Sequence, residues 1–289
     1  LQPVAGSFFG WDTARSTAAP MVSLLLAVGQ PAGWRTYRDG MDLLARRLAE
    51  GLDVATGSTV HQVITDRDTA RVIVDGTVLT ARSVVVCTPA PVAARLFANA
   101  PKDEAAYLSA CTFTPTLKVS CLLDRPLAPQ SSRPLYVLLT PEAEESALAG
   151  IIVDHVKHPQ RAPAGKGLLS LMATAGTIPD LLAAPEHEII DHLTGAARRY
   201  VPGLESAGAR YAVHRFVHGL PEATAEALQR RARFMARDVS PVEYAGDWVM
   251  LRPASEGAVR SGALAASRVL SRLGGRRTVN RITMGEKAS

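Results

Sequence analysis

The sequence of 289 residues contains no apolar stretch long enough to cross a membrane. The longest one, MVSLLLAVG at 21–29, is well short of the roughly 20 residues that a spanning helix needs. The first residues also lack the basic region followed by an apolar core that marks a secretory signal peptide. The composition, 47% hydrophobic and 20% charged, is typical of a soluble globular protein with a sizeable core.

Cysteine and aromatic residues are scarce. Cys87, Cys111 and Cys121 have no metal-ligand spacing and leave one thiol unpaired, which predicts a reduced, cytoplasmic protein with small buried cysteines. Aromatic residues make up 5% of the chain, and the net charge of +5 comes from Lys and Arg scattered among acids. This pattern indicates a solvated surface and argues against a nucleic-acid interface. The G-x-S-x-G elbow of serine hydrolases is also absent.

The hydrophobic period changes along the first third of the chain. Residues 39–52 place Met41, Leu44, Leu48 and Leu52 at helical spacing and predict an amphipathic helix. Residues 53–89 then alternate apolar and polar side chains, which predicts several short strands. The continuous apolar run at 83–89 is typical of a strand covered on both faces, as in a parallel sheet.

The middle of the chain is rich in strand patterns. A short helix is expected at 90–100, strands at 114–127, 135–140, 150–156, 166–176 and 209–223, and an amphipathic helix at 184–204. A charged stretch follows, and helix and strand then alternate again. The order predicts an α/β domain of the nucleotide-binding type, interrupted by an inserted α+β domain.

The segment at 242–270 carries the most specific pattern. VEYAGDW predicts a strand with Asp247 at its carboxyl end, and EGAVRSGALAASRVL predicts a helix with many small residues. The N-terminus of such a helix offers free N–H groups and a partial positive charge to a phosphate or another electron-rich group. The same pattern also fits close packing of a helix on a sheet, with Asp247 as an N-terminal cap.

AGDW…PASEGAVRSGALAA resembles the C-terminal flavin motif of the superfamily of amine oxidases, protoporphyrinogen oxidases and carotenoid or squalene desaturases. The blocks at 40–63 and 75–96 resemble its middle segment, in the same order. The resemblance implies a partial FAD/NAD(P)-binding Rossmann-like domain interrupted by a mixed-sheet substrate domain. The FAD-binding segments would be 39–95 and 239–275, the substrate domain 1–38 (its helical part) and 96–238, and the tail 276–289.

The resemblance also implies an FAD cofactor and the residues that hold it. Gly246 and Asp247 would contact the ribityl or phosphate part of FAD. The backbone at Glu256, Gly257 and Ala258 would point its amides at the pyrimidine edge of the flavin. Val60 would lie on the adenine side.

The implied chemistry is transfer of a hydride from the substrate to the flavin. Lys118 matches the lysine that reaches flavin N5 through a water in amine oxidases, although an alternating strand also accommodates a solvent-facing lysine. Leu251 and Ala254 stand where amine oxidases have part of an aromatic cage. The segment is closer to the desaturase branch, which implies an apolar, isoprenoid substrate lined by Phe216, Met250 and Leu251. An amine is the alternative.

The sequence lacks the G-x-G-x-x-G fingerprint with which such enzymes begin. In the segment DGM at 39–41, Asp39 stands where the family usually has the first of two glycines. The central sheet would then lack strands and expose an edge. We expect a fragment, one chain completed by a second chain or copy, or a non-catalytic partner subunit that has lost FAD. No metal site is expected, because His214 and His218 could share a metal only on a helix and their segment has a strand pattern.

Overall fold

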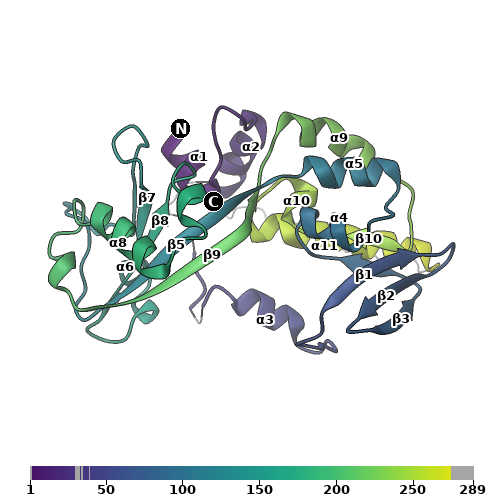
Figure 1. Cartoon of the computed structure of the whole chain (residues 1–289), viewed down its shortest axis with the longest axis horizontal. Coiled ribbons are helices and arrows are strands. Elements are labelled where there is room, and N and C mark those ends of the chain that lie inside the picture. The colour runs from purple at the N-terminus through teal and green to yellow at the C-terminus, as the bar shows by residue number, and fades with distance from the viewer. Residues whose placement is uncertain (1, 30–32, 34, 39, 275–289) are drawn as a thin grey trace, which may run out of the picture. The chain divides into compact units, whose positions relative to one another are not determined.

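The computed structural model describes residues 2–29, 33, 35–38 and 40–274 (Figure 1). The chain has a mixed α/β fold that divides into two compact units. Unit 1 comprises the described residues up to Thr56 together with Thr112–Ala225. Unit 2 comprises Gly57–Cys111 and the described residues from Glu226 onward. Asp39 and the tail 276–289 lie outside the described residues.

Unit 1 is built on a five-stranded sheet in which every neighbouring pair is antiparallel. Its spatial order is β6 (Val137–Leu139), β7 (Leu148–Val153), β8 (Gly167–Ala173), β5 (Phe113–Leu123) and β9 (Ala209–Pro221). All five predicted strands are present. The strand expected at 150–156 is too long, because Asp154 begins a short helix, α6 (Asp154–Lys157).

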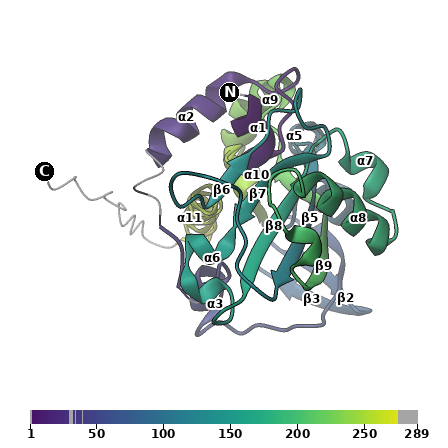
Figure 2. The ribbon, with the colours of Figure 1, turned by 90° about the vertical axis from the view of Figure 1, so that its left-hand side faces the viewer.

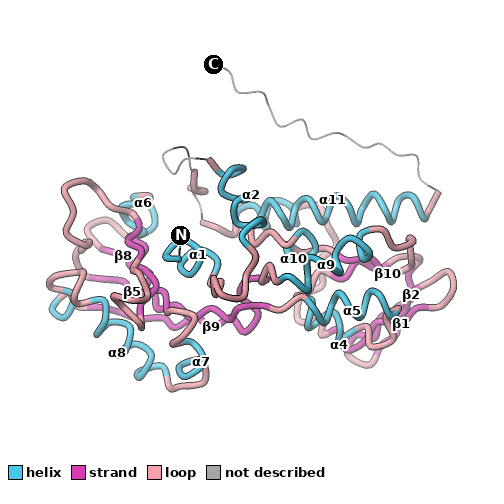
Figure 3. The backbone as a smooth tube through the Cα atoms, turned by 90° about the horizontal axis from the view of Figure 1, so that it is seen from above, coloured by secondary structure: helices cyan, strands magenta, loops and turns pink. Residues whose placement is uncertain are grey.

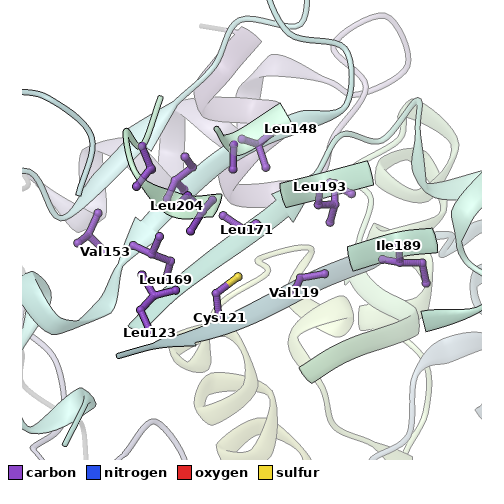
Figure 4. Packing of buried hydrophobic residues seen from close by; sticks show 14 of the residues in the cluster. Val119, Cys121, Leu123, Leu148, Val153, Leu169, Leu171, Ile189, Leu193 and Leu204 are labelled. Atoms are coloured by element: carbon purple, nitrogen blue, oxygen red, sulfur yellow. The ribbon is translucent and has the colours of Figure 1, made fainter. Parts of the chain in front are cut away.

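One face of this sheet forms the main core. Along β5 the buried side chains alternate with partly exposed ones, as expected for a strand with one covered face. The buried set packs under α7 (Ile178–Leu181) and α8 (Glu186–Ala197), which lie on the same side of the sheet (Figure 2). Figure 4 shows this packing, to which the strands contribute Val119, Cys121, Leu123, Leu148, Val153, Leu169 and Leu171, and α8 contributes Ile189 and Leu193. Each large side chain contributes about 1.5–3 kcal/mol when fully buried.

The remaining helices of unit 1 come from the start of the chain. They are α1 (Gln2–Phe9), α2 (Ala18–Val28) and α3 (Leu43–Ala49). Two 3-10 helices lie further along the chain, at Pro159–Arg161 and Leu204–Ser206. Phe9, Trp11, Met21 and Leu24 form a second buried cluster. The expected amphipathic helix at 39–52 is shorter, and its apolar residues are not buried: Met41, Leu48 and Leu52 are each more than 60% exposed.

Unit 2 contains two small sheets and most of the longer helices. An antiparallel meander is formed by β1 (Val60–Thr65), β2 (Ala70–Val74) and β3 (Thr77–Ala81), and a parallel pair by β4 (Val84–Val86) and β10 (Val242–Tyr244). The helices are α4 (Ala90–Leu96), α5 (Lys102–Ala110), α9 (Ala225–Met235, which starts in unit 1), α10 (Asp247–Met250) and α11 (Ser255–Arg272). Figure 3 shows α11 as a long continuous helix. The charged stretch for which the sequence predicted no element forms α9, and Ala227 and Phe234 lie on its buried side.

The strand predicted from the apolar run at 83–89 is parallel, as expected, because β4 pairs with β10 in register from Val84 opposite Val242. The prediction that both of its faces are covered is wrong for Val85, which is 39% exposed, whereas Val86 on the other face is buried. Successive side chains of a strand point to opposite faces, and only the face of Val86 is well covered.

A buried charge cluster stabilises the second strand of this pair. Glu243 on β10 is fully buried and accepts hydrogen bonds from Arg237 at 2.5 Å and from Arg268 at 2.8 Å. Removal of one partner from such a cluster costs about 3–5 kcal/mol, because a charge is left buried without compensation. The cluster thereby holds β10 against the end of α9 and against α11. Among the described residues, no helix is both long and apolar enough to cross a bilayer.

Candidate functional site

The turn that follows β10 has a backbone conformation that requires glycine. Gly246 has φ +147°, and a Cβ atom placed there would lie 2.5 Å from Nε1 of Trp248. Its N–H donates to Oγ of Ser261 at 2.8 Å, and that hydroxyl donates to the carbonyl of Ala258 at 2.7 Å. The turn is therefore tied to the first turns of α11.

Asp247 follows directly and begins α10. Burial raises the pKa of its carboxyl to about 6, although the backbone N–H groups of Trp248 and Asp247 itself lower it in part. The residue preceding α11 is Ala254, and it provides no side-chain cap. The sequence pattern also allowed Asp247 to be the N-terminal cap of α11, and this alternative is wrong. A carboxyl that is costly to ionise and is held at a tight turn is a candidate for contact with a ligand.

The small residues of α11 bring its backbone close to the turn. Gly257, Ser261 and Ala265 form the buried side of the helix, and a Cβ at Gly257 would clash with the carbonyl oxygen of Arg252. Ala258 is exposed. The carboxylate of Glu256 is paired with Arg252 at 2.8 Å and with Arg260. The amide of Ala258 donates to the carbonyl of Ala254 at 3.2 Å, so the prediction that it faces a ligand is wrong. The backbone amides of Glu256 and Gly257, and not the Glu256 carboxylate, are thus the groups left for a ligand there.

Aromatic packing anchors this turn to the carboxyl end of β4. Nε1 of Trp248 donates to the carbonyl of Thr88 at 3.1 Å, and the hydroxyl of Tyr107 donates to the carbonyl of Trp248 at 3.0 Å. The ring of Phe234 stacks on that of Tyr107 at 4.3 Å between centroids. The turn of Gly246 and Asp247 therefore lies at the carboxyl edge of a parallel strand pair, where α/β proteins bind ligands.

The other predicted site residues of unit 2 differ from one another in exposure and contacts. Val60 begins β1 and is 38% exposed. Met250 is partly buried, and its sulfur accepts a hydrogen bond from Arg231 at 3.5 Å. Leu251 is 3% exposed and has a left-handed backbone with φ +48°. Leu251 is thus a core residue of the turn in this structure.

In unit 1, Lys118 and Phe216 share the sheet face opposite the main core. Lys118 on β5 lies opposite His214 on β9, and Thr116 lies opposite Phe216. The intervening residue Leu117 is fully buried on the α8 side. Because alternate residues of paired strands share a face, Lys118, His214 and Phe216 lie together. Phe216 is 52% exposed, so this face can contact another molecule.

His214 is a residue that sequence reasoning considered only as a metal ligand. Its Nε2 lies 3.1 Å from Oγ of Ser120, and burial together with the charge of Lys118 lowers its pKa. His218, four residues further along β9, lies roughly 13 Å away at strand spacing. In the part of the chain that the structure describes, no group of three or more His, Cys, Asp or Glu side chains could hold a metal ion.

The fold is similar to that of several solved oxidases. A candidate protoporphyrinogen oxidase from Exiguobacterium sp. 255-15 has 17% identity and a TM-score of 0.67, over 93% of this chain and 62% of that one. Cyclohexylamine oxidase from Brevibacterium oxydans IH-35A has 13% identity and a TM-score of 0.69, over 94% and 63%. Putrescine oxidase bound to putrescine has 17% identity and a TM-score of 0.62, over 81% and 53%.

The chain thus spans between about half and two thirds of the length of these structures. No protein of curated function is significantly similar to it in sequence. The sequence profile of the family described as flavin-containing amine oxidoreductase matches residues 2–270, which is most of the chain. The chain therefore belongs to the flavin-containing amine oxidoreductase family.

Proposed function

We propose that this chain is part of an FAD-dependent oxidoreductase and that unit 2 contributes to the FAD site. The observation that supports this most directly is the turn of Gly246 and Asp247, which Ser261 ties to the small-residue helix α11. Family membership implies a flavin. FAD as the form of flavin, and these residues as its ligands, are the proposal.

The residues of this turn and of the start of α11 fit one part of an FAD molecule. At Gly246 and Gly257 a Cβ atom would collide with Trp248 and with Arg252, so both glycines are needed to hold the turn close to the start of α11. Asp247 would accept hydrogen bonds from ribityl hydroxyls or lie beside the phosphates, and the amides of Glu256 and Gly257 would face the pyrimidine edge. Val60 would lie on the adenine side.

The flavin would accept a hydride from the substrate. Unit 1 would be the substrate domain. Lys118, together with its neighbour His214, would present hydrogen-bond donors on the open sheet face and orient a water for the reaction. The exposed ring of Phe216 supports contact with an apolar substrate in unit 1. Leu251 is a core residue of unit 2 and is not proposed as a substrate contact.

The substrate class has one alternative. The proteins named cyclohexylamine oxidase and putrescine oxidase are similar in fold, and an amine would make this chain a flavin amine oxidase. Anaerobic bleaching of bound flavin separates the two classes. A C15 isoprenoid hydrocarbon would reduce the flavin under the first proposal, and a primary alkylamine under the second.

A non-catalytic role is the other alternative. The edge of β4 opposite β10 is a place where a second chain or copy could add a strand and complete the FAD domain. A non-catalytic subunit would show the same pairing without flavin chemistry. The cytoplasmic location expected from the three cysteines also stays a proposal.

The deciding experiment is a visible absorption spectrum of the purified chain with an intact mass, followed by titration with FAD. We expect a flavin spectrum, or saturable binding of added FAD. Asp247→Ala should weaken this binding about tenfold or more, because a charge-assisted hydrogen bond contributes about 1.5–3 kcal/mol. Asp68→Ala changes an exposed aspartate elsewhere in unit 2 and should have no effect. Equal FAD affinity in both variants would refute the assignment of Asp247. No binding by the unaltered chain would mean either that a further chain must complete the site or that the chain is a non-catalytic subunit that has lost FAD.

A further inference from the structure

A serine and a histidine that are 94 residues apart in the chain meet on the open face of the sheet of unit 1. Strands β5 and β9 pair along most of their lengths (Figure 1). The register places Lys118 opposite His214 and Ala212 opposite Ser120, so Ser120 and His214 are diagonal neighbours on one face. No local sequence motif joins the two residues, because they come together only when the two strands align.

The hydroxyl of Ser120 and the imidazole of His214 are in direct contact. Oγ of Ser120 lies 3.1 Å from Nε2 of His214, within the roughly 2.6–3.2 Å that separates a nucleophile from its base in enzymes. Burial, together with the charge of Lys118, lowers the pKa of His214, so the ring is neutral at neutral pH. With the ring proton on Nδ1, the lone pair of Nε2 accepts the hydrogen bond of the Ser120 hydroxyl. The pair therefore has the geometry and the protonation state of an activated nucleophile.

Three neighbours on the same face complete the surroundings of this pair. Lys118 is opposite His214 and two residues before Ser120 on β5, so its positive charge lies close to the hydroxyl. Such a charge stabilises the negative charge that develops on a carbonyl oxygen when the carbonyl carbon is attacked. Met172 on β8 lies opposite Lys118, and Phe216 is 52% exposed, so both offer apolar surface. Ser120 and His214 are partly exposed, and a substrate can reach them.

We propose that Ser120 and His214 form a nucleophile–base pair that hydrolyses carboxylic esters, with Lys118 beside the carbonyl oxygen. The alcohol part of the ester would be aliphatic or aromatic, since Phe216 and Met172 are the apolar side chains next to the pair. This activity is separate from flavin chemistry. All of these residues belong to unit 1, so hydrolysis needs no flavin, and failure of either proposal leaves the other intact.

The reaction has two halves, and water is the co-reactant. Oγ of Ser120 forms a bond to the carbonyl carbon of the ester while its proton passes to Nε2 of His214. The bond from that carbon to the alcohol oxygen then breaks, and the alcohol leaves with the proton. A water next attacks the acyl-serine and gives one proton to His214, which passes it to Oγ of Ser120 as the carboxylic acid is released. Nothing is oxidised or reduced.

Hydrolysis of p-nitrophenyl butyrate by the full chain, without added flavin, tests the proposal. We expect saturable release of p-nitrophenolate. After a rapid acid quench, peptide mass spectrometry should find a butyryl group on Ser120. Ser120→Ala and His214→Gln should each lower kcat about a hundredfold or more, and Lys118→Met about tenfold or more. Ser132→Ala and His187→Gln make the same changes at exposed positions of unit 1 and should leave the rate unchanged.

A variant that keeps a nucleophile guards against a loss of activity through misfolding. Ser120→Cys should still be acylated at position 120, because a thiol beside a neutral imidazole is also a nucleophile. Equal rates for Ser120→Ala and the unaltered chain would overturn the proposal and leave the contact of Ser120 with His214 as a structural hydrogen bond only. So would a butyryl group found on other side chains and not on Ser120.

Discussion

The hydroxyl of Ser261 accepts a hydrogen bond of 2.8 Å from the backbone N–H of Gly246, although the two residues are 15 positions apart. The same hydroxyl donates to the carbonyl of Ala258. One buried side chain therefore joins the turn after β10 to the first turns of α11. This link determines how Asp247 and the amides of α11 are presented.

Ser261→Ala should lower the free energy of unfolding by about 1–3 kcal/mol, because the N–H of Gly246 is left without its partner. Urea unfolding measures this change. Ser271→Ala, at an exposed position near the end of the same helix, should change it by less than about 0.5 kcal/mol. If the two variants were equally stable, the link between turn and helix would not contribute to stability.

Two glycines of the same region should respond in opposite directions to alanine. Gly246→Ala places a Cβ against Trp248 at a backbone angle that side chains rarely adopt, so it should cost about 1–3 kcal/mol or more. At Gly262, inside α11, nothing lies within 4 Å of an added Cβ. Gly262→Ala should therefore stabilise the chain by up to about 1 kcal/mol. Thermal unfolding of both variants checks the prediction, which fails if Gly246→Ala melts as high as Gly262→Ala.

The stability of the ligand-free chain should carry a pH dependence from Asp247. Burial raises the pKa of its carboxyl from 3.8 to about 6, so the folded state favours the protonated form. This contribution is fully present below about pH 4 and is lost as the pH rises through about 6. At pH 7, Asp247→Asn should therefore be more stable than the unaltered chain, by up to about 3 kcal/mol.

The measurement is urea unfolding of Asp247→Asn and the unaltered chain at pH 4 and pH 7. The advantage of Asp247→Asn should shrink at pH 4. An advantage of the same size at both pH values would show that it does not arise from the ionisation of Asp247. Asp68→Asn should show no advantage at either pH.

Lys118 should influence the titration of His214 across the strand pair. Burial and the Lys118 charge both lower the pKa of His214, so Lys118→Met should raise that pKa towards its ordinary value. Lys166→Met removes a lysine that is paired with Asp124 elsewhere in unit 1 and should leave the pKa unchanged. Titration of the imidazole by NMR distinguishes the two variants. If Lys118→Met also left the pKa unchanged, the two side chains would not interact across the open face.

The same variant tests the role proposed for Lys118. In flavin-loaded protein, Lys118→Met should slow reduction of the flavin by substrate at least tenfold and leave FAD affinity unchanged. Lys166→Met is again the control. Equal rates in the two variants would show that Lys118 has no part in the reaction.

Strong local patterns were sufficient for much of the fold. The strand pattern at 114–127 predicted β5, the amphipathic pattern at 184–204 predicted α8, and the small residues after Ser255 predicted α11. In each case the period of the apolar residues matches the geometry of a single helix or strand. Helix α9 was missed because its many charged residues obscured the apolar side formed by Ala227 and Phe234.

The sequence by itself determined the fold class and the family, because these depend on residue types and spacings that lie close together in the chain. Only the tertiary structure decided that Lys118, His214 and Phe216 share one face, that Leu251 is a core residue, and that Ser120 contacts His214. Alternation shows that a strand has two faces but not which of them the rest of the chain covers. That choice depends on strand pairing and helix packing between distant segments, and it decides which side chains are left to bind a ligand.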